Sequence, residues 1–286
     1  MASVYLATCA ALPQGDEDAE VLIACLGARH VEARWQAWND PDARWDDALV
    51  VLRSTWDYTD DRVAFLDWAR RVPRLANPAP VVEWNSDKTY LRDLENAGVP
   101  TVTTSWVAPG DPFELPAADE FVVKPSVGAG SRGAGRFASG QAVAAQAHIA
   151  ELHVAGCTAM VQPYLPAVDT HGETALIYLA GRFSHAVSKG AMLPPGVVHP
   201  ARSHSLYVEE RIQARPPSAA EHALGEQLME VLRGRTGRDL LYARVDLLPG
   251  PDGPVVVELE LSEPSLFLGH ADAAADRFAA AIAERV

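Results

Sequence analysis

Two apolar runs near the C-terminus, joined by the turn-rich stretch PGPDGP, constrain the fold more than any other feature of the chain. The first run carries Arg244 and Asp246, and the second carries Glu258 and Glu260. Side chains at even spacing share one face of a β-strand, so a hairpin brings the two pairs face to face. Such a cluster favours Mg²⁺, which takes one or two carboxylates together with substrate phosphates. The alternative for this segment alone is an exposed amphipathic hairpin with its glutamates in solvent.

Length and charge narrow the range of partners. At 286 residues the chain exceeds the size at which a single core keeps growing, so we expect two or three packed units. A formal net charge of −14 without a Lys/Arg run argues against nucleic acid as a partner. No apolar stretch reaches membrane-spanning length, the first residues lack the basic region of a signal peptide, and the three cysteines show no metal-ligand spacing. We therefore expect a cytoplasmic protein with no membrane partner, and a homo-oligomer is compatible with the sequence.

Strand and helix patterns alternate over the first 80 residues, as is typical of a βαβ unit. Strand patterns cover residues 3–10, 28–38 and 46–52. A helix is predicted over residues 60–72, with Val63, Leu66, Ala69 and Val72 on its buried face. This N-terminal segment is therefore expected to form a small α/β domain.

The stretch RSTWDY follows the third of these strands, at the edge where open α/β sheets bind ligands. Its residue types suit a small zwitterion, because a guanidinium pairs with a carboxylate and an aspartate pairs with an ammonium. The candidate substrate contacts are Arg53, Ser54, Thr55, Asp57 and Tyr58. The alternative is an ordinary loop in which Thr59 or Asp60 caps the next helix.

A short helix is expected after residue 86, with Ser86 or Asp87 as its cap and Leu91 and Leu94 as its apolar stripe. Lys88 would then lie in the first helical turn, where a cation opposes the helix dipole unless an anion binds there. This placement suggests a phosphate contact. A solvated surface lysine is the alternative.

The segment EFVVKPSVGAGSRGAGRF joins a strand that ends near Lys124 to a glycine-rich loop. Its glycines do not open a helix after a first strand, so the dinucleotide-binding fingerprint does not apply, and there is no Walker motif. A glycine-rich hairpin remains, whose backbone N–H groups can cover phosphates while Lys124 supplies a point charge. The alternative is a mobile surface turn.

A later strand runs into QPYL, Gln162 to Leu165, and cannot pair beyond Pro163. The Gln162 amide offers both a donor and an acceptor, which suits the edge of an adenine. Two further strand patterns follow around a turn at Gly181. They carry Glu173, Arg182, His185 and Lys189.

In this order the motifs resemble the ATP-grasp superfamily over essentially the whole chain. The resemblance implies an ATP-grasp fold of the α+β or α/β class, with a Rossmann-like N-terminal α/β domain and two α+β subdomains that clamp ATP. The implied units are a substrate domain over residues 1–85, a central subdomain with the glycine-rich loop over 86–165, and a C-terminal subdomain with the metal site over 166–286.

The resemblance also implies roles for individual residues. Arg244 would contact the transferred phosphoryl group, and Arg182 would join the substrate contacts. The implied Mg²⁺ ligands, which would also accept Mn²⁺, are Asp246, Glu258 and Glu260, although many members have Asn in place of Glu260. The implied ATP contacts are Lys88, Lys124, Ser126, Gly128, Gly130, Ser131, Gly133, Gln162, Pro163, Tyr164, Leu165 and Glu173.

Within the superfamily, the strings RSTWDY, KPSVGAGSRGAG, MVQPYLPAV, SHAVSKGAM and ELELSEPSLF resemble the branch that contains the synthetase of the antibiotic D-cycloserine. This resemblance implies an ATP- and Mg²⁺-dependent carboxylate-amine ligase that cyclises O-ureido-D-serine through an acyl phosphate. His185 and Lys189 are the candidate general bases. The alternatives are an intermolecular amino-acid or peptide ligase, an ATP-grasp kinase, and a nucleotide-binding module without catalysis. Substrate identity, chirality and oligomeric state stay open.

Overall fold

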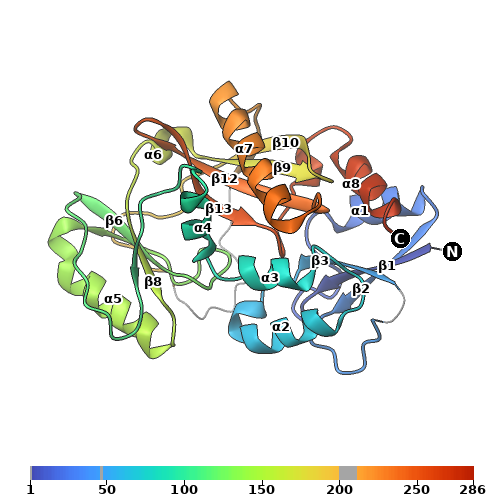
Figure 1. Ribbon diagram of the computed structural model, residues 1–286, viewed down its shortest axis with the longest axis horizontal. Coiled ribbons are helices and arrows are strands. Elements are labelled where there is room, and N and C mark those ends of the chain that lie inside the picture. Colours follow the sequence, from blue (N-terminus) through green and yellow to red (C-terminus); the bar gives the residue numbers. More distant parts are fainter. Residues whose placement is uncertain (1, 46–47, 200–210) are drawn as a thin grey trace.

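The computed structural model describes residues 2–45, 48–199 and 211–286, and the strands in these ranges form three sheets (Figure 1). The N-terminal sheet is parallel and has the order β2-β1-β3-β4. Its central strand β3 is buried on both faces, which explains its unbroken apolar start LVVL. The elements are β1 (Ala2–Thr8), α1 (Ala19–Gly27), β2 (Val31–Ala37), β3 (Leu49–Ser54), the 3-10 turn η1 (Tyr58–Asp60), α2 (Arg62–Arg71) and β4 (Leu75–Ala76).

The predicted buried face of helix α2 is wrong at Val63, whose exposed fraction is 72%. The helix instead buries Phe65 and Trp68 beside Leu66 and Ala69. Phe65 and Trp68 stack on each other and pack against Trp38 of the neighbouring loop. Two large aromatic rings bury more apolar area than one valine, so the helix turns toward them.

The second sheet is antiparallel, with the order β5-β8-β6-β7, and helix α5 covers one of its faces. Ile149 and Leu152 of the helix pack against Phe121 and Phe137 of the sheet. The elements are β5 (Ser105–Val107), β6 (Glu120–Pro125), β7 (Gly135–Ala138), η2 (Ser139–Gln141), α5 (Ala142–Val154) and β8 (Ala159–Pro163).

The third sheet is also antiparallel and has the order β11-β10-β9-β12-β13. Helix α7, which begins with the expected capping box of Ser218 and Glu221, packs on one of its faces. The elements are α6 (Val168–His171), β9 (Glu173–Leu179), β10 (Arg182–Lys189), β11 (Ile212–Ala214), α7 (Ala219–Thr236), β12 (Tyr242–Gly250), β13 (Gly253–Glu260), η3 (Leu268–His270) and α8 (Ala274–Ala283).

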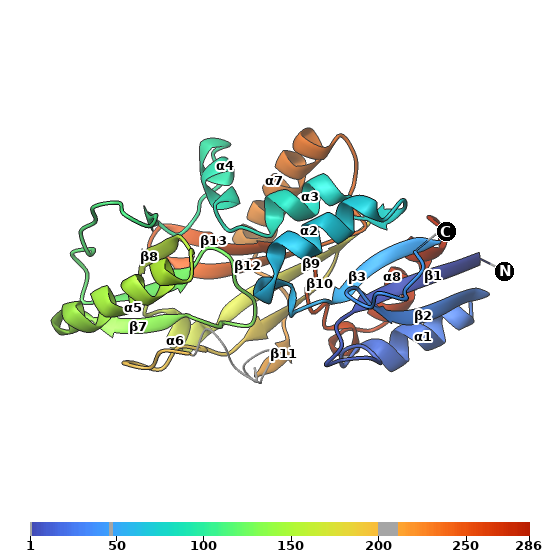
Figure 2. The same ribbon diagram turned by 90° about the horizontal axis from the view of Figure 1, so that it is seen from below.

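Two short helices, α3 (Ala79–Asn85) and α4 (Tyr90–Asn96), share the α7 side of the third sheet (Figure 2). Lys88 lies in the turn between them and not in the first turn of a helix, so the expected conflict with a helix dipole does not arise. Asp87 caps this turn by accepting a hydrogen bond from the Thr89 amide at 3.0 Å. Helix α4 begins at Tyr90, two residues after Lys88, so the expectation that Lys88 lies in the first helical turn is wrong.

The last helix returns to the beginning of the chain. Helix α8 lies beside α1, and both chain ends are at the same end of the molecule (Figure 1). Phe278 of α8 packs edge-on against Tyr242 of the third sheet, in the same core as Leu22 of α1. The segment between β13 and α8 consequently runs from the third sheet to the N-terminal sheet.

Packing thus joins segments that are distant in the chain. The expected division of the chain into three units, with boundaries at residues 85 and 165, stays a prediction. Across the described ranges, no helix is both long and apolar enough to span a membrane.

Candidate active site

A cavity of about 890 Å³ lies among the second sheet, the third sheet and the loops of the N-terminal sheet. The chain contains three lysines, Lys88, Lys124 and Lys189, and all of them line this cavity. The remaining basic residues are arginines, which are spread over the whole chain. Three flexible ammonium groups around one space make it suited to a strongly anionic ligand.

Strand alternation places the acidic cluster on the cavity side of the third sheet. In β12, Ala243 and Val245 face helix α7, so Arg244 and Asp246 point to the opposite side. The hairpin register pairs Arg244 with Glu260 and Asp246 with Glu258, so the two pairs lie opposite each other as predicted. The two strands meet at a short turn, with Gly250 opposite Gly253.

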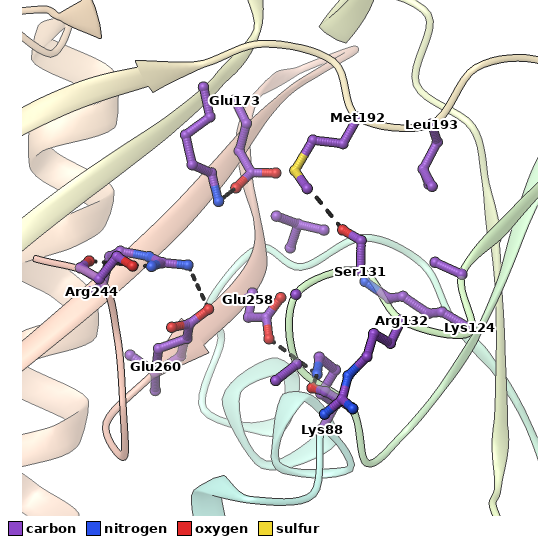
Figure 3. A pocket seen from close by; sticks show the side chains of 18 of the residues that line it. Lys88, Lys124, Ser131, Arg132, Glu173, Met192, Leu193, Arg244, Glu258 and Glu260 are labelled. Atoms are coloured by element: carbon purple, nitrogen blue, oxygen red, sulfur yellow. Dashed lines mark hydrogen bonds and ion pairs between the residues drawn. The ribbon is translucent and has the colours of Figure 1, made fainter. Parts of the chain in front are cut away.

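The three carboxylates lie close enough to share one cation. Asp246, Glu258 and Glu260 each offer an oxygen within 4.8 Å of the others. Carboxylate oxygens are the ligands that Mg²⁺ prefers, so this donor set fits the metal that the sequence implies. Nη2 of Arg244 donates to Asp246 at 2.8 Å. It also donates to Glu260 at 2.5 Å (Figure 3).

Burial and neighbouring charges shift the pKa values of the three carboxylates in different directions. Burial opposes ionisation of Asp246, but Arg244 and Lys189 outweigh it and hold the pKa of Asp246 well below its usual range. Burial also opposes ionisation of Glu258, and here Lys88 and Lys124 outweigh it and lower the pKa. For Glu260, burial wins over Arg244 and raises the pKa to about 8, with the charges of Glu258 and Asp246 adding to the effect.

Side chains of α3 and α4 hold the backbone of β13 next to these carboxylates. Strand β13 is at the edge of its sheet, so its outer backbone groups need partners. Asn85 donates to the Leu259 carbonyl oxygen at 2.8 Å and accepts from the Leu261 amide at 2.7 Å. The Tyr90 hydroxyl lies 2.8 Å from both the carbonyl oxygen and the amide nitrogen of Leu259. These contacts replace a neighbouring strand.

The three lysines differ in their partners. Lys88 donates to the Gly128 carbonyl oxygen at 2.5 Å and pairs with Glu258 at 3.1 Å, across the cavity in Figure 3. Lys189 pairs with Asp246 at 2.9 Å and with Glu173. Lys124 has no acidic partner among the residues that the structure describes, and burial lowers its pKa. A partly buried lysine without a carboxylate is the one most in need of an anionic ligand.

The glycine-rich loop lies over the cavity and is tied to the N-terminal domain. Gly130 and Ser131 both have left-handed backbones with φ of 58°, which turn the loop sharply. The guanidinium of Arg132 donates to the Trp56 carbonyl oxygen at 2.9 Å and also to Thr59, both in the loop after β3. The opposite side of the cavity includes Gln162, Pro163, Tyr164 and Leu165.

Most of the predicted ATP and metal residues surround the cavity, and some do not. Ser126 and Gly133 do not line it, because Ser126 is buried beside Thr158 and the Gly133 amide donates to the His199 carbonyl oxygen. Asp246 is buried behind the cavity wall, with its oxygens bound to Arg244 and Lys189. The Gln162 side-chain nitrogen donates a hydrogen bond to the Thr104 hydroxyl at 2.8 Å. A ligand in the cavity can therefore contact the neighbouring backbone and the rest of the Gln162 side chain.

The prediction that Arg53 contacts the substrate is wrong, because its side chain is fully buried, with an exposed fraction of 0%. It donates to the Pro264 carbonyl oxygen and to Asp16, each at 3.1 Å, and so joins two loops of the domain interior. Ser54 and Thr55 are equally buried, and Asp57 accepts a hydrogen bond from Trp38. Of this predicted group only Tyr58 lines the cavity, together with its neighbour Trp56.

Arg182 and His185 are also outside the cavity. Both are on β10 with Lys189, but His185 is four residues back, which is about 13 Å along a strand. His185 is held between the Ser184 hydroxyl and the Leu266 carbonyl oxygen, and burial lowers its pKa to about 4. Arg182 is exposed at the far end of the strand. Neither is placed to act on a ligand in the cavity.

Two residues that the motifs did not indicate are prominent at the site. Arg132 ties the glycine-rich loop to the N-terminal domain, and Glu263 is a buried carboxylate that lines the cavity. Arg132 was visible in the sequence as the single charged residue between glycines. No local signal marks Glu263, because its role depends on loops from the other end of the chain.

Known proteins resemble this chain in sequence and in fold. Residues 4–77 match the family described as the N-terminal domain of the D-cycloserine synthetase DcsG. The cycloserine biosynthesis protein DcsG of Streptomyces lavendulae is 37% identical over 288 residues, covering 95% of this chain and 94% of that protein. A crystal structure of D-cycloserine synthetase DcsG has a TM-score of 0.88 at 37% identity and 99% coverage of both chains. An ATP-grasp RimK domain protein from Sphaerobacter thermophilus shares the fold, with a TM-score of 0.67, 18% identity, and 98% and 99% coverage.

Proposed function

This chain belongs to the D-cycloserine synthetase family and has the ATP-grasp fold, as the motifs predicted, and on that premise we propose that it closes the ring of D-cycloserine from O-ureido-D-serine. It is an ATP-dependent ligase, of the carboxylate-amine class that serves cycloserine biosynthesis. The identity of the substrate and the reaction through an acyl phosphate are what we propose beyond this.

The observation that carries the proposal is the meeting of all three lysines with Arg244, Glu258 and Glu260 around one cavity, with Asp246 buried directly beside them. This arrangement suits a nucleotide triphosphate and a metal ion, because the cations match the phosphates and the carboxylates match the metal. A binding module without catalysis would not need this cluster, whose burial costs stability.

We assign the end of the cavity beside β6 and β8 to ATP. Lys88 and Lys124 bind its phosphates, with the backbone of Gly128 and Gly130 above them, and the Gln162 to Leu165 segment lies against the adenine. Asp246, Glu258 and Glu260 would hold Mg²⁺, or Mn²⁺ with the same oxygen ligands, and the metal would neutralise charge on the transferred phosphoryl group.

The first chemical step is activation of the substrate carboxylate. One carboxylate oxygen attacks the γ-phosphorus of ATP, ADP leaves, and an acyl phosphate forms. Arg244 and Lys189 stabilise the negative charge on the phosphoryl oxygens, and no protein nucleophile is needed. Lys189 is held between Asp246 and Glu173 and therefore acts as a cation and not as a base.

The second step is ring closure. The nitrogen bonded to the side-chain oxygen of the same substrate attacks the acyl carbon and expels phosphate. Nucleophile and electrophile are in one molecule, so a high effective molarity assists the step. The carbamoyl group on that nitrogen must then leave with one water as carbon dioxide and ammonia to give D-cycloserine. Closure of the glycine-rich loop protects the acyl phosphate from water.

The test is incubation of the protein with ATP, Mg²⁺ and O-ureido-D-serine as the sole amino acid, followed by mass analysis. We expect D-cycloserine and one phosphate per ring, and roughly 10²-fold less of both with the Glu258→Gln variant. Absence of both ring and phosphate would contradict the proposal. Phosphate release that requires a second amine would indicate an intermolecular ligase, and a phosphorylated end product would indicate a kinase.

A further inference from the structure

Glu263 is a carboxylate that the reaction described above does not use. It follows Glu260 by three residues and lines the cavity, with an exposed fraction of 7%. The end of β3 and the segment directly after it fix its position. Trp56 Nε1 donates to the Glu263 carbonyl oxygen at 2.8 Å, and Arg53 donates to the next carbonyl, that of Pro264, at 3.1 Å.

The surroundings of Glu263 supply hydrogen bonding but no positive partner. The Tyr58 hydroxyl donates to its carboxylate, and burial keeps that hydroxyl protonated by raising the Tyr58 pKa well above its usual value. No basic side chain forms an ion pair with Glu263 in the part of the chain that the structure describes. Burial raises its pKa to about 7, against the more distant positive charge of Lys88. A carboxylate buried in this way lacks a cation.

The other acidic groups near this end of the cavity are committed or exposed. Asp16 pairs with Arg53 at 3.1 Å, and Asp60 pairs with Arg132 at 3.3 Å. Glu17 lines the cavity but is exposed, so an ion pair there would be weak. Glu263 is therefore the carboxylate best placed to bind a cationic group of a ligand between the N-terminal loops and the acidic hairpin.

We propose that Glu263, supported by Tyr58, binds the ammonium group of the amino-acid substrate. The inference rests on the proposed function and deepens it. In an α-amino acid the ammonium is on the carbon next to the carboxylate, so a cation at Glu263 places that carboxylate toward the phosphoryl-transfer site. Trp56 and Arg53 act as positioning residues, because they hold the backbone around Glu263.

The ion pair also keeps the α-nitrogen out of the reaction. A nitrogen held as ammonium has no lone pair and cannot attack carbon. Pairing with Glu263 therefore leaves the α-nitrogen unreactive, while the nitrogen bonded to the side-chain oxygen closes the five-membered ring.

The test compares two ligands on three proteins, with Mg²⁺ and a non-hydrolysable ATP analogue present. The ligands are O-ureido-D-serine and the analogue in which hydrogen replaces its α-amino group. The wild-type protein should bind the amino compound about 30-fold or more tightly than the analogue, the range expected for a buried charge pair. Glu263→Gln should lose most of this preference while its affinity for the ATP analogue changes less than about threefold. Glu17→Gln, the matched exposed carboxylate, should keep the preference.

Glu263→Asp retains the charge and should recover part of the preference, which a purely structural role would not predict. An unchanged preference in Glu263→Gln would overturn the inference. So would an absence of preference in the wild-type protein, a result that needs no variant to fold. Both outcomes leave ring formation by the wild-type protein intact, whereas failure to form the ring would overturn the proposed function itself.

Discussion

The hydroxyl of Tyr90 lies 2.8 Å from both the carbonyl oxygen and the amide nitrogen of Leu259, the residue between Glu258 and Glu260. One side chain of α4 thus satisfies the outer edge of β13 where the strand presents its carboxylates. Together with Asn85, Tyr90 holds the backbone of β13 on both sides of Glu260.

Tyr90→Phe removes the hydroxyl and leaves the buried Leu259 amide without this partner. An unsatisfied buried group costs about 1–3 kcal/mol of unfolding free energy. We also expect half-maximal activity to require a higher Mg²⁺ concentration, because the glutamates are less well held. Urea unfolding and Mg²⁺ titrations of ADP release measure the two effects.

The control for this variant is Tyr178→Phe. Tyr178 is equally buried in the third sheet, but on the face covered by α7, away from the carboxylates. It should leave the Mg²⁺ requirement unchanged. An identical Mg²⁺ requirement in Tyr90→Phe and wild-type protein would show that the hydroxyl does not position the metal ligands.

Glu258 and Glu260 should respond differently to loss of charge. Glu258 is held ionised by two lysines, so Glu258→Gln should lower ADP release roughly 10²-fold or more at saturating Mg²⁺. Within the described ranges Glu260 pairs with Arg244 and with no lysine, so a neutral amide in Glu260→Gln should be tolerated far better. Steady-state assays of both variants decide the matter, and equal losses would refute the unequal roles.

The acidic hairpin could be predicted from the sequence because every determinant is local. Alternation of period two, a turn of the right composition and even spacing suffice to bring Arg244 and Asp246 opposite Glu258 and Glu260, whereas the exact register also depends on a β-bulge between Asp246 and Leu247. The capping box of α7 and the glycine-rich loop are local in the same way.

The N-terminal half of the site could not be predicted in the same way. Arg53 has the chemistry of a carboxylate receptor, but its partners are 37 and 211 residues distant in the chain and enclose it completely. The same long-range contacts bring Glu263 to the cavity. Helix α2 shows a further limit of prediction from sequence. Its periodicity was compatible with two different buried faces, and only the packing against Trp38 selects one of them.

Chemical acetylation offers a test of the nucleotide end, because every lysine of the chain lines the cavity. Only the neutral amine reacts, so Lys124, whose pKa is lowered by burial, should react fastest. Lys88, whose pKa is raised by Glu258 despite its burial, should react more slowly. An ATP analogue with Mg²⁺ should protect Lys124, as followed by peptide mass spectrometry. Denatured protein, in which the three sites should react alike, is the control, and unprotected labelling of Lys124 would contradict its assignment to ATP.

His185 should make stability depend on pH. Its pKa is about 4 in the folded protein because burial disfavours the charged ring, whereas the unfolded value is 6.5. As pH falls from 6.5 to 4 the unfolded chain takes up a proton that the folded protein does not, so stability falls over this window by about 3 kcal/mol. His185→Gln removes this contribution, and its free energy of unfolding should fall less steeply than that of wild-type protein. Parallel curves for the two proteins would rule the effect out.

The central claim, activation of the substrate carboxylate as an acyl phosphate followed by ring closure, can be tested with oxygen isotopes. O-Ureido-D-serine labelled with ¹⁸O at both carboxylate oxygens is turned over with ATP and Mg²⁺, and phosphate and product are analysed by mass spectrometry. One labelled oxygen should pass to the γ-phosphorus and leave with phosphate, while the other remains in the ring carbonyl. Each phosphate should therefore contain one ¹⁸O for every ring formed. Unlabelled phosphate released during ring formation would contradict the account.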